Sequence, residues 1–299
     1  PEDGEELETL VTRADAAMRA ARARRDGFVE FWCKARQMKF RSAREMLINL
    51  DGAVERGEFV LHYQPIFRTS DRQLIGCEAL LRWQHLDHGL VTPHEFMKSL
   101  EQGDGVHKVG QWVLEQAVGL VAEAKAVHQS TIRMCVNVTG RELMHIGLPA
   151  RLQQILHEHG VAPRQLQIEV PEVALEDRVA AIEPAIEDLR NLGVRVALDG
   201  FGKSRCTLDV LMGPRLDGVK IGSSLLNKMG QSRRRMQVIE AVVQMWRSLG
   251  CEVWADAVEN LRDAESLRGF GVDYVQGYAH GAPQSRDKML AQIAAAAAK

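Results

Sequence analysis

Polar residues recur in or just after the short apolar runs of this chain. They are Glu78, Asn137, Glu169, Asp199, Lys220, Asp256, Glu259 and Gln276. Charged side chains rarely lie beside apolar strands without partners, so these residues are expected to meet at one site. Three of these carboxylates together with one amide oxygen would form an all-oxygen donor set that suits Mg²⁺ or Mn²⁺. The alternative is that each residue separately faces solvent or caps a helix.

Arg82 lies four residues after Glu78 and adds a guanidinium to this set. A guanidinium can bind a phosphodiester through two parallel hydrogen bonds, so Arg82 is a candidate phosphate ligand. A surface ion pair is the alternative. His85 and His88 share one loop without a suitable third ligand, which makes them a weak candidate for a metal site.

Short β-rich runs alternate with longer amphipathic runs from Phe59 onward, and these elements must position the polar residues. Strands are predicted at 59–67, 74–83, 132–138, 166–170, 194–198, 218–221, 252–255 and 274–275. Helices are predicted at 92–101, 109–128, 147–159, 179–192, 231–249 and 261–269. This order predicts an α/β fold, a TIM-like (β/α)8 barrel with its chemistry at the carboxyl ends of the strands. The short polar turn at 69–72 indicates that the first strand is antiparallel.

The part before the barrel reads as a helical extension. An amphipathic helix is predicted at 7–23, a strand-like run at 27–32 and a second helix at 39–57. One helix and one strand cannot form a core alone, so the first part is expected to be the end of a preceding domain.

Composition excludes several classes of function. The 299 residues carry a net charge of −2, which argues against nucleic acid as the main ligand. The five cysteines form no paired motif, which favours a reducing cytoplasm. No apolar stretch reaches the roughly 20 residues of a membrane span, so no membrane segment is expected.

Eight motifs in order make the chain resemble bacterial EAL domains, whose active members are cyclic di-GMP phosphodiesterases. The motifs are Tyr63-Gln64-Pro65-Ile66, Glu78-Ala79-Leu80-Leu81-Arg82-Trp83, Val136-Asn137-Val138-Thr139, Leu166-Gln167-Ile168-Glu169-Val170-Pro171-Glu172, Leu198-Asp199-Gly200-Phe201-Gly202, Val219-Lys220-Ile221, Ala255-Asp256-Ala257-Val258-Glu259 and Val275-Gln276-Gly277-Tyr278. Residues 14–21 resemble the last helix of a GGDEF domain. The resemblance divides the chain into a GGDEF-like remnant (1–36), a helical linker (37–57), an EAL domain (58–292) and a tail (293–299).

In active relatives two divalent cations flank the scissile phosphodiester. The resemblance implies that Glu78, Asn137, Glu169 and Asp199 hold the first metal, and that Glu78, Lys220 and Glu259 act in catalysis if the domain is active. It implies ligand contacts from Gln64, Glu78, Leu80, Arg82, Asn137, Asp199, Asp256, Glu259 and Gln276.

The chain departs from the family pattern around the second metal. Gly200 replaces the second of two adjacent aspartates, and Gly222 replaces another aspartate. Asp256 replaces a glutamate, and Pro171 replaces a threonine. The loop at 202–207 also differs from the usual Gly-Thr-Gly-Tyr-Ser-Ser. These changes imply one Mg²⁺ or Mn²⁺ site, a lost second site and impaired hydrolysis.

Three functions follow from these departures. The first is a cyclic di-GMP receptor with little or no hydrolysis, which signals to a protein effector. The second is a slow Mg²⁺- or Mn²⁺-dependent phosphodiesterase that releases pGpG. The third is a protein-interaction scaffold that neither binds nor cleaves the dinucleotide. The resemblance also implies a homodimer, formed through the altered loop.

Overall fold

The computed structural model describes residues 43–297 except 51, 87, 104, 177, 205–207 and 228. The elements predicted at 7–23 and 27–32, and the GGDEF-like segment, lie outside these residues. The chain divides into a smaller unit, residues up to 59 with 82–100, and a larger unit, residues 60–81 with 101–299. Among the described residues, no helix is both long and apolar enough to cross a bilayer.

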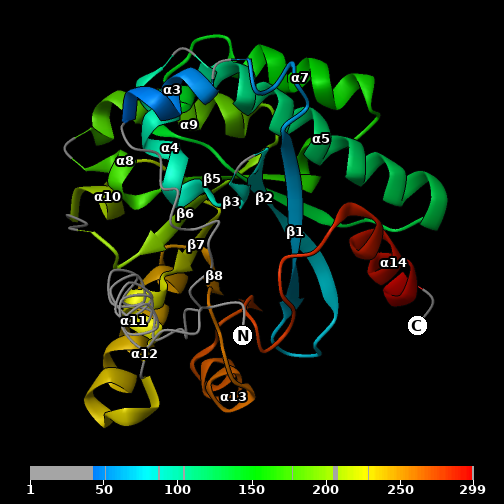
Figure 1. The fold of residues 1–299 in the computed structure, drawn as a ribbon. Coiled ribbons are helices and arrows are strands. Elements are labelled where there is room, and N and C mark those ends of the chain that lie inside the picture. Colours follow the sequence, from blue (N-terminus) through cyan, green and yellow to red (C-terminus); the bar gives the residue numbers. More distant parts are fainter. Residues whose placement is uncertain are drawn as a thin grey trace, which may run out of the picture. The chain divides into compact units, whose positions relative to one another are not determined.

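The strands form one sheet in the order β1-β9-β8-β7-β6-β5-β4-β2-β3, and β1 also pairs with β2 (Figure 1). They are β1 (Phe59–Arg68), β2 (Leu74–His85), β3 (Gly89–Val91), β4 (Arg133–Asn137), β5 (Leu166–Pro171), β6 (Arg195–Phe201), β7 (Gly218–Ile221), β8 (Glu252–Ala255) and β9 (Tyr274–Val275). The β1–β2 pairing closes the sheet, which confirms the predicted TIM-like α/β barrel. β1 is antiparallel to β9, with Phe67 opposite Val275, so the prediction for the first strand is also confirmed.

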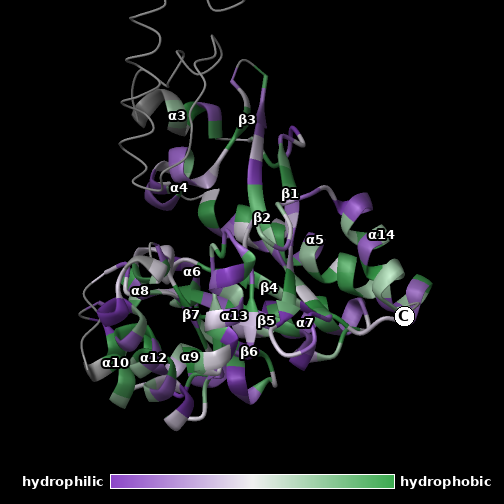
Figure 2. Cartoon of the chain, turned by 90° about the horizontal axis from the view of Figure 1, so that it is seen from below, coloured by the Kyte–Doolittle hydropathy of each residue, from purple (hydrophilic) through white to green (hydrophobic). Residues whose placement is uncertain are grey.

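Helices alternate with the strands. The α-helices are α3 (Ala43–Leu50), α4 (Pro93–Gln102), α5 (Gly105–His128), α6 (Gly140–Leu143), α7 (Leu148–Glu158), α8 (Glu172–Leu175), α9 (Val179–Asn191), α10 (Leu208–Met212), α11 (Ser223–Leu226), α12 (Arg233–Ser248), α13 (Leu261–Phe270) and α14 (Arg286–Ala297). The described part of the chain also includes the 3₁₀-helices η1 (Pro163–Gln165) and η2 (Met229–Gln231). The surrounding helices such as α7, α9 and α12 show both polar and apolar residues in Figure 2, as expected for helices that bury one face.

The smaller unit corrects one sequence prediction. The helix predicted at 39–57 includes α3, which ends at Leu50, and residues 52–57 form turns. Gly52 and Gly57 have φ values of 71° and 68°, which a helix cannot accommodate. Within this unit, the ring of Phe59 packs against those of Trp83 and Phe96. The Trp83 indole N–H donates to Glu58 Oε2 over 3.0 Å.

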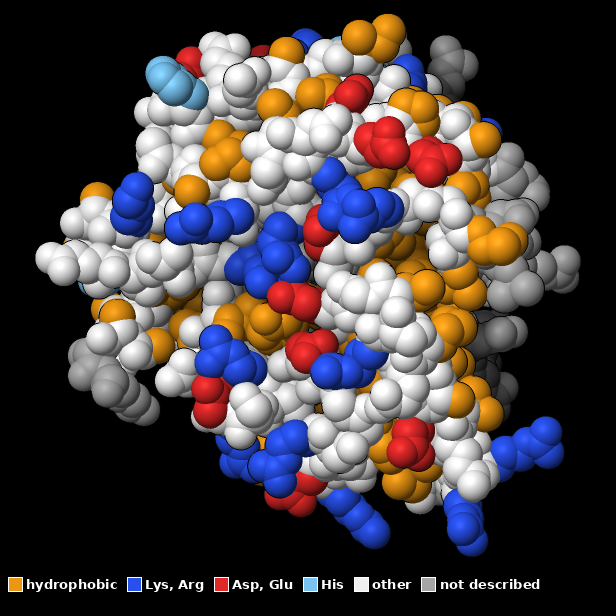
Figure 3. All heavy atoms as spheres, turned by 180° about the vertical axis from the view of Figure 1, so that it is seen from behind, with side chains coloured by type: hydrophobic (Ala, Val, Ile, Leu, Met, Phe, Trp, Pro, Cys, Tyr) orange, Lys and Arg blue, Asp and Glu red, His pale blue; other side chains and the backbone are white. Residues whose placement is uncertain are grey.

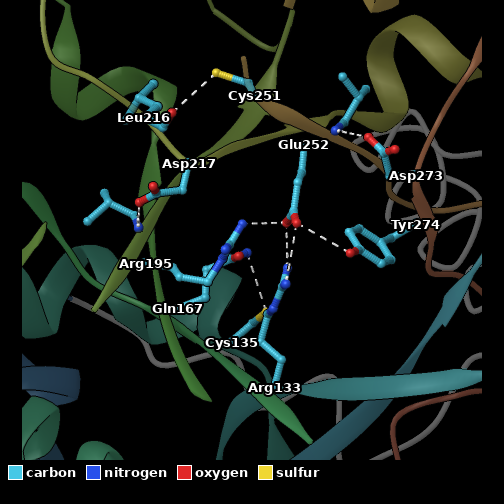
Figure 4. A network of polar contacts seen from close by, with 12 residues as sticks. Arg133, Cys135, Gln167, Arg195, Leu216, Asp217, Cys251, Glu252, Asp273 and Tyr274 are labelled. Carbon is cyan, nitrogen blue, oxygen red and sulfur yellow. Dashed lines mark hydrogen bonds and ion pairs between the residues drawn. The ribbon is translucent and has the colours of Figure 1, made fainter. Parts of the chain in front are cut away.

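The barrel interior combines apolar packing with a polar plug at the amino ends of the strands. Ile66, Cys135 and Trp254 form a buried apolar cluster inside the barrel. Nearer the amino ends, Glu252 Oε2 lies 2.6 Å from a guanidinium nitrogen of both Arg133 and Arg195 (Figure 4). The same carboxylate accepts a hydrogen bond from the Tyr274 hydroxyl, over 3.3 Å.

Helix α14 crosses the boundary predicted at residue 292. The helix continues to Ala297, and Ile293 is fully buried. The last turns of this helix therefore contribute apolar packing to the larger unit.

Candidate functional site

The larger unit brings most of the predicted site residues to the carboxyl ends of adjacent strands. Asn137 is directly opposite Glu169 in the pairing of β4 with β5. Glu78 is opposite Cys135, two residues before Asn137, and Asp199 is opposite Pro171, two residues after Glu169. Side chains two residues apart point to the same face of a sheet, so these four point to one side.

Lys220 is the centre of the buried network. Its side chain is 1% exposed, and Nζ lies 2.7 Å from Glu78 Oε2 and 2.8 Å from Glu169 Oε2. Since β7 lies between β6 and β8, this ammonium reaches across the barrel to β2 and β5. These contacts bring three of the predicted charged residues together.

Amides complete the network around Glu78. Asn137 Nδ2 donates to Glu78 Oε1 over 2.6 Å, and Gln276 Nε2 donates to Glu78 Oε2 over 2.7 Å. Gln276 Nε2 also lies 3.1 Å from Gln64 Oε1, and Gln64 Nε2 donates to the Gly281 carbonyl. Both oxygens of Glu78 are thus held in place by donors from other elements.

Burial and charge shift the pKa values of these groups in different directions. Burial raises the pKa of Glu169 to about 8; Lys220 opposes this shift, while Glu78 and Asp199 add to it. Burial also acts to raise the pKa of Glu78, but Lys220 and the amide donors outweigh it and lower that pKa. For Lys220, Glu169 and Glu78 outweigh burial and raise the pKa well above its usual value. The ammonium is therefore charged at neutral pH.

Asp256, which follows β8, belongs to the same electrostatic group. Burial raises its pKa, and Glu78 and Asp199 add to the shift, while the positive charges of Lys220 and Lys203 act against it. Asp256 Oδ1 accepts the backbone N–H of Ala257 over 2.7 Å. Sequence reasoning found Asp256, but it did not find the influence of Lys203.

The predicted ligands have the oxygen atoms that a hard cation such as Mg²⁺ prefers, but their side chains are not arranged around a common metal position. Among the residues that the structure describes, no three His, Cys, Asp or Glu side chains are placed to hold a metal ion together. Instead, the Lys220 ammonium contacts two of the four predicted ligands. Burial is the main cause of the raised pKa of Glu169, Glu78 and Asp199 add to it, and an added cation would favour the ionised form. Carboxylate and amide oxygens are also the ligands that Mg²⁺ prefers.

Three further predicted residues differ in their surroundings. Glu259 is exposed, three residues after Asp256. Leu80 is half-buried on β2. Arg82 belongs to the smaller unit and stays a predicted phosphate ligand.

Glu172 is a site residue that sequence reasoning did not single out. It is 3% exposed, and its oxygens accept the backbone N–H groups of Gly202 (3.3 Å) and Ser204 (2.7 Å). These contacts hold the turn that follows β6. The signal available in the sequence was a second glutamate, three residues after Glu169, at the end of an apolar run.

Comparison with known proteins identifies the family. The EAL domain family matches residues 48–283, so this chain belongs to that family. Over 296 residues it is 30% identical to the bifunctional diguanylate cyclase/cyclic di-GMP phosphodiesterase MucR of Pseudomonas aeruginosa, and this covers 98% of the chain and 43% of MucR. It is also 30% identical to the cyclic di-GMP phosphodiesterase NbdA of the same species, over 95% of the chain and 36% of NbdA.

A solved structure agrees with this assignment. The structure described as PaMucR phosphodiesterase in complex with c-di-GMP matches with a TM-score of 0.76 and 29% identity, over 82% of this chain and 99% of that one. The chain spans less than half the length of the curated relatives MucR and NbdA.

Proposed function

We propose that this EAL domain is a receptor that binds cyclic di-GMP at the carboxyl ends of the barrel strands and hydrolyses it slowly or not at all. The proposal combines two features of the site. The buried Glu78, Lys220 and Gln276 network is complete, while the chain has glycine at 200 and 222, where the family pattern has aspartates. The names of MucR and NbdA, and of the bound PaMucR structure, support the choice of ligand.

The proposal of slow or absent hydrolysis depends on Gly200 and Gly222, which lack the carboxylates of the family pattern. Hydrolysis at a two-metal site needs carboxylates that hold both cations, and several kcal/mol of charge stabilisation correspond to roughly a 10³-fold change in rate. Ligand binding depends on hydrogen bonds and charge from other groups, which these glycines do not remove.

Within this proposal, Glu78, Asn137, Glu169 and Asp199 would hold one Mg²⁺ or Mn²⁺ ion, which would supply positive charge beside a phosphodiester. Lys220 fixes the two glutamates and keeps a positive charge under the site. Gln64 and Gln276 offer amide groups at the β1 and β9 side.

Calorimetry with cyclic di-GMP, in EDTA and then in Mg²⁺ or Mn²⁺, tests the proposal when the same samples are analysed for pGpG by chromatography. Binding with intact ligand is the expected result. Accumulation of pGpG at a steady rate would instead establish the slow phosphodiesterase. Absence of both heat and product would favour the protein-interaction scaffold. Glu187→Gln, an exposed change on α9, is the control variant.

A receptor that does not consume its ligand must transmit binding through protein contacts. We therefore infer a protein effector, and a homodimer in which the loop at 202–207 takes part. Sedimentation velocity with and without cyclic di-GMP checks the homodimer: a sedimentation coefficient that stays at the monomer value in both samples would rule it out.

A further inference from the structure

Lys203 lies in a slot that two glycines leave open beside the site. A β-carbon on Gly200 would lie 2.8 Å from Lys203 Cδ and 3.3 Å from its Nζ. A β-carbon on Gly222 would lie 3.0 Å from both Cγ and Cε of the same lysine. The aliphatic part of Lys203 therefore occupies the space where side chains at 200 and 222 would begin.

The backbone explains only one of the two glycines. Gly200 has a φ of 75°, a left-handed conformation that favours glycine. Gly222 has φ −74° and ψ 158°, an extended conformation that any residue adopts. The constraints at this position are instead the Lys203 chain and the Gly200 carbonyl oxygen, which would lie 3.2 Å from a β-carbon.

The turn that carries Lys203 is held in place. Glu172 binds the N–H groups of Gly202 and Ser204, the two neighbours of Lys203 in the chain. The Lys203 N–H donates to the Gly200 carbonyl over 2.9 Å, and the Ser224 hydroxyl donates to the Gly202 carbonyl over 2.7 Å. A cation on such a turn loses little conformational entropy when it binds an anion.

The site contains more acidic than basic side chains, so an additional cation such as Lys203 would favour the binding of an anionic ligand. The carboxylates of Glu78, Glu169, Asp199 and Asp256 act on the same region as Lys220, and Lys203 acts on Asp256. Acidic side chains thus outnumber the single Lys220 ammonium in this group. A cyclic dinucleotide brings two phosphodiester anions, so its binding needs further positive charge.

From these contacts we propose that Lys203 is a phosphate-binding residue of this site, a cation built into the chain that allows the cyclic dinucleotide to bind without a divalent ion. The inference rests on the proposed receptor function. Lys203 is exposed, so its ammonium can reach an entering ligand while its chain stays between the glycines.

Calorimetry in EDTA on three variants tests the role of Lys203. Lys203→Met should weaken cyclic di-GMP binding by about 10-fold or more, because one charged hydrogen-bonding partner is lost. Binding by this variant should also depend less on ionic strength than binding by the wild type. Lys203→Arg should retain most of the affinity. Lys288→Met, an exposed lysine on α14, should leave it unchanged.

A fourth variant, Gly222→Asp, adds a carboxylate beside the Lys203 chain. It should weaken binding in EDTA, since an ion pair would engage the ammonium, and Mg²⁺ should restore part of the affinity. Thermal unfolding of each variant shows that it is folded.

The outcomes separate the two proposals. A wild type that binds in EDTA while Lys203→Met binds equally well would overturn the role of Lys203 and leave the receptor function standing. If the wild type binds cyclic di-GMP only with Mg²⁺, the proposal that Lys203 allows binding without a divalent ion is also overturned. A wild type that binds under neither condition would overturn both.

Discussion

Lys220 shows how a single buried cation can organise several acids. Its ammonium contacts Glu78 and Glu169 on two different strands, and all three side chains are buried. A buried ion pair adds little net stability, but removal of one partner leaves uncompensated charge in the interior. The network therefore holds the geometry of the site more than it stabilises the fold.

Replacement of Lys220 by methionine should lower the free energy of unfolding by about 3–5 kcal/mol at neutral pH, since the ionised Glu78 would lose its buried cation. The loss should shrink as the pH falls toward 5, because Glu78 of the variant, which no longer has Lys220 beside it, can then be buried in its neutral form. Urea denaturation at both pH values measures the difference. Lys288→Met, on the surface, should change stability by less than about 0.5 kcal/mol. An equal loss at both pH values would contradict the assignment of charge.

Glu169 gives the protein a predictable pH dependence. Its folded-state pKa of about 8 lies above the usual 4.5, so the folded state binds a proton more tightly than the unfolded state. The associated stability is complete below pH 4.5 and is lost as the pH rises through 8. Asp256, whose pKa is also raised, adds to the same slope.

In Glu169→Gln this group no longer titrates, so the fall in unfolding free energy between pH 5 and pH 8 should be smaller than in the wild type. Denaturation curves across that range provide the measurement, with Glu187→Gln as the surface control. If the wild type and Glu169→Gln lose stability in parallel, Glu169 is ionised throughout and the assigned pKa is wrong.

Part of the site was predictable at the residue scale because strand ends and alternation place side chains without knowledge of the loops. Glu78, Asn137, Glu169, Lys220 and Gln276 meet for this reason. The position of Lys203 could not be foreseen, since it depends on the left-handed turn at Gly200 and on the close approach of Gly222.

Two of the glycines in helix α5, Gly110 and Gly119, have different surroundings. A β-carbon on Gly110 would lie 1.7 Å from Glu142 Oε1 and 2.9 Å from its Cδ. Glu142 is buried and forms a capping box with Thr139 at the start of α6, with Thr139 N–H and Oγ1 bonded to its Oε2. By contrast, a β-carbon on Gly119 meets only His159 Cε1, at 3.7 Å.

Gly110→Ala should therefore destabilise the fold by about 1–2 kcal/mol, because it displaces Glu142 and breaks the capping box of α6. Gly119→Ala in the same helix is the matched control and should stabilise by up to about 1 kcal/mol, owing to the higher helix propensity of alanine. Thermal and urea denaturation of both variants provide the measurement. Similar changes in the two variants would show that Glu142 moves aside at no cost.

Element boundaries were predictable where a single pattern dominates. The strands at 218–221, 252–255 and 274–275 match the sequence prediction because each is a short apolar run between turns. The strand predicted to end at 198 continues to Phe201, with a register shift between Leu198 and Phe201. Gly200 interrupts the apolar run there, and the pairing with β7 resumes at Phe201. The short β3 was missed, since its three residues carry no repeating pattern.

Within the larger unit, the two ends of the barrel have different tasks. The carboxyl ends carry Lys220 and its acids, while the amino ends carry the Arg133, Arg195 and Glu252 plug (Figure 4). Barrels of this class place chemistry at the first end and stability at the second. On the face seen in Figure 3, basic and acidic side chains are interspersed.

The two ends should respond to mutation independently. Glu252→Gln removes the negative charge that Arg133 and Arg195 share, and since these side chains are 17–29% exposed, a loss of about 1–3 kcal/mol in unfolding free energy is expected. The Arg133 guanidinium also lies 5.2–5.3 Å from the ring centroids of Tyr274 and Trp254, so the change should loosen β4, β8 and β9 together. Cyclic di-GMP affinity should stay within about 2-fold of the wild-type value, because distant sites contribute independently.

Lys203→Met should show the reverse pattern, with lost affinity and unchanged stability, since the side chain is exposed and its turn is held by Glu172. Urea denaturation and calorimetry on the two single variants and the double variant measure both properties. Glu265→Gln, whose side chain is 64% exposed, controls for the loss of a surface carboxylate. If Glu252→Gln weakened ligand binding as much as Lys203→Met does, the plug at the amino ends and the site at the carboxyl ends would be coupled through the barrel interior. If the changes in unfolding free energy and in affinity add in the double variant, the plug and the ligand site contribute independently.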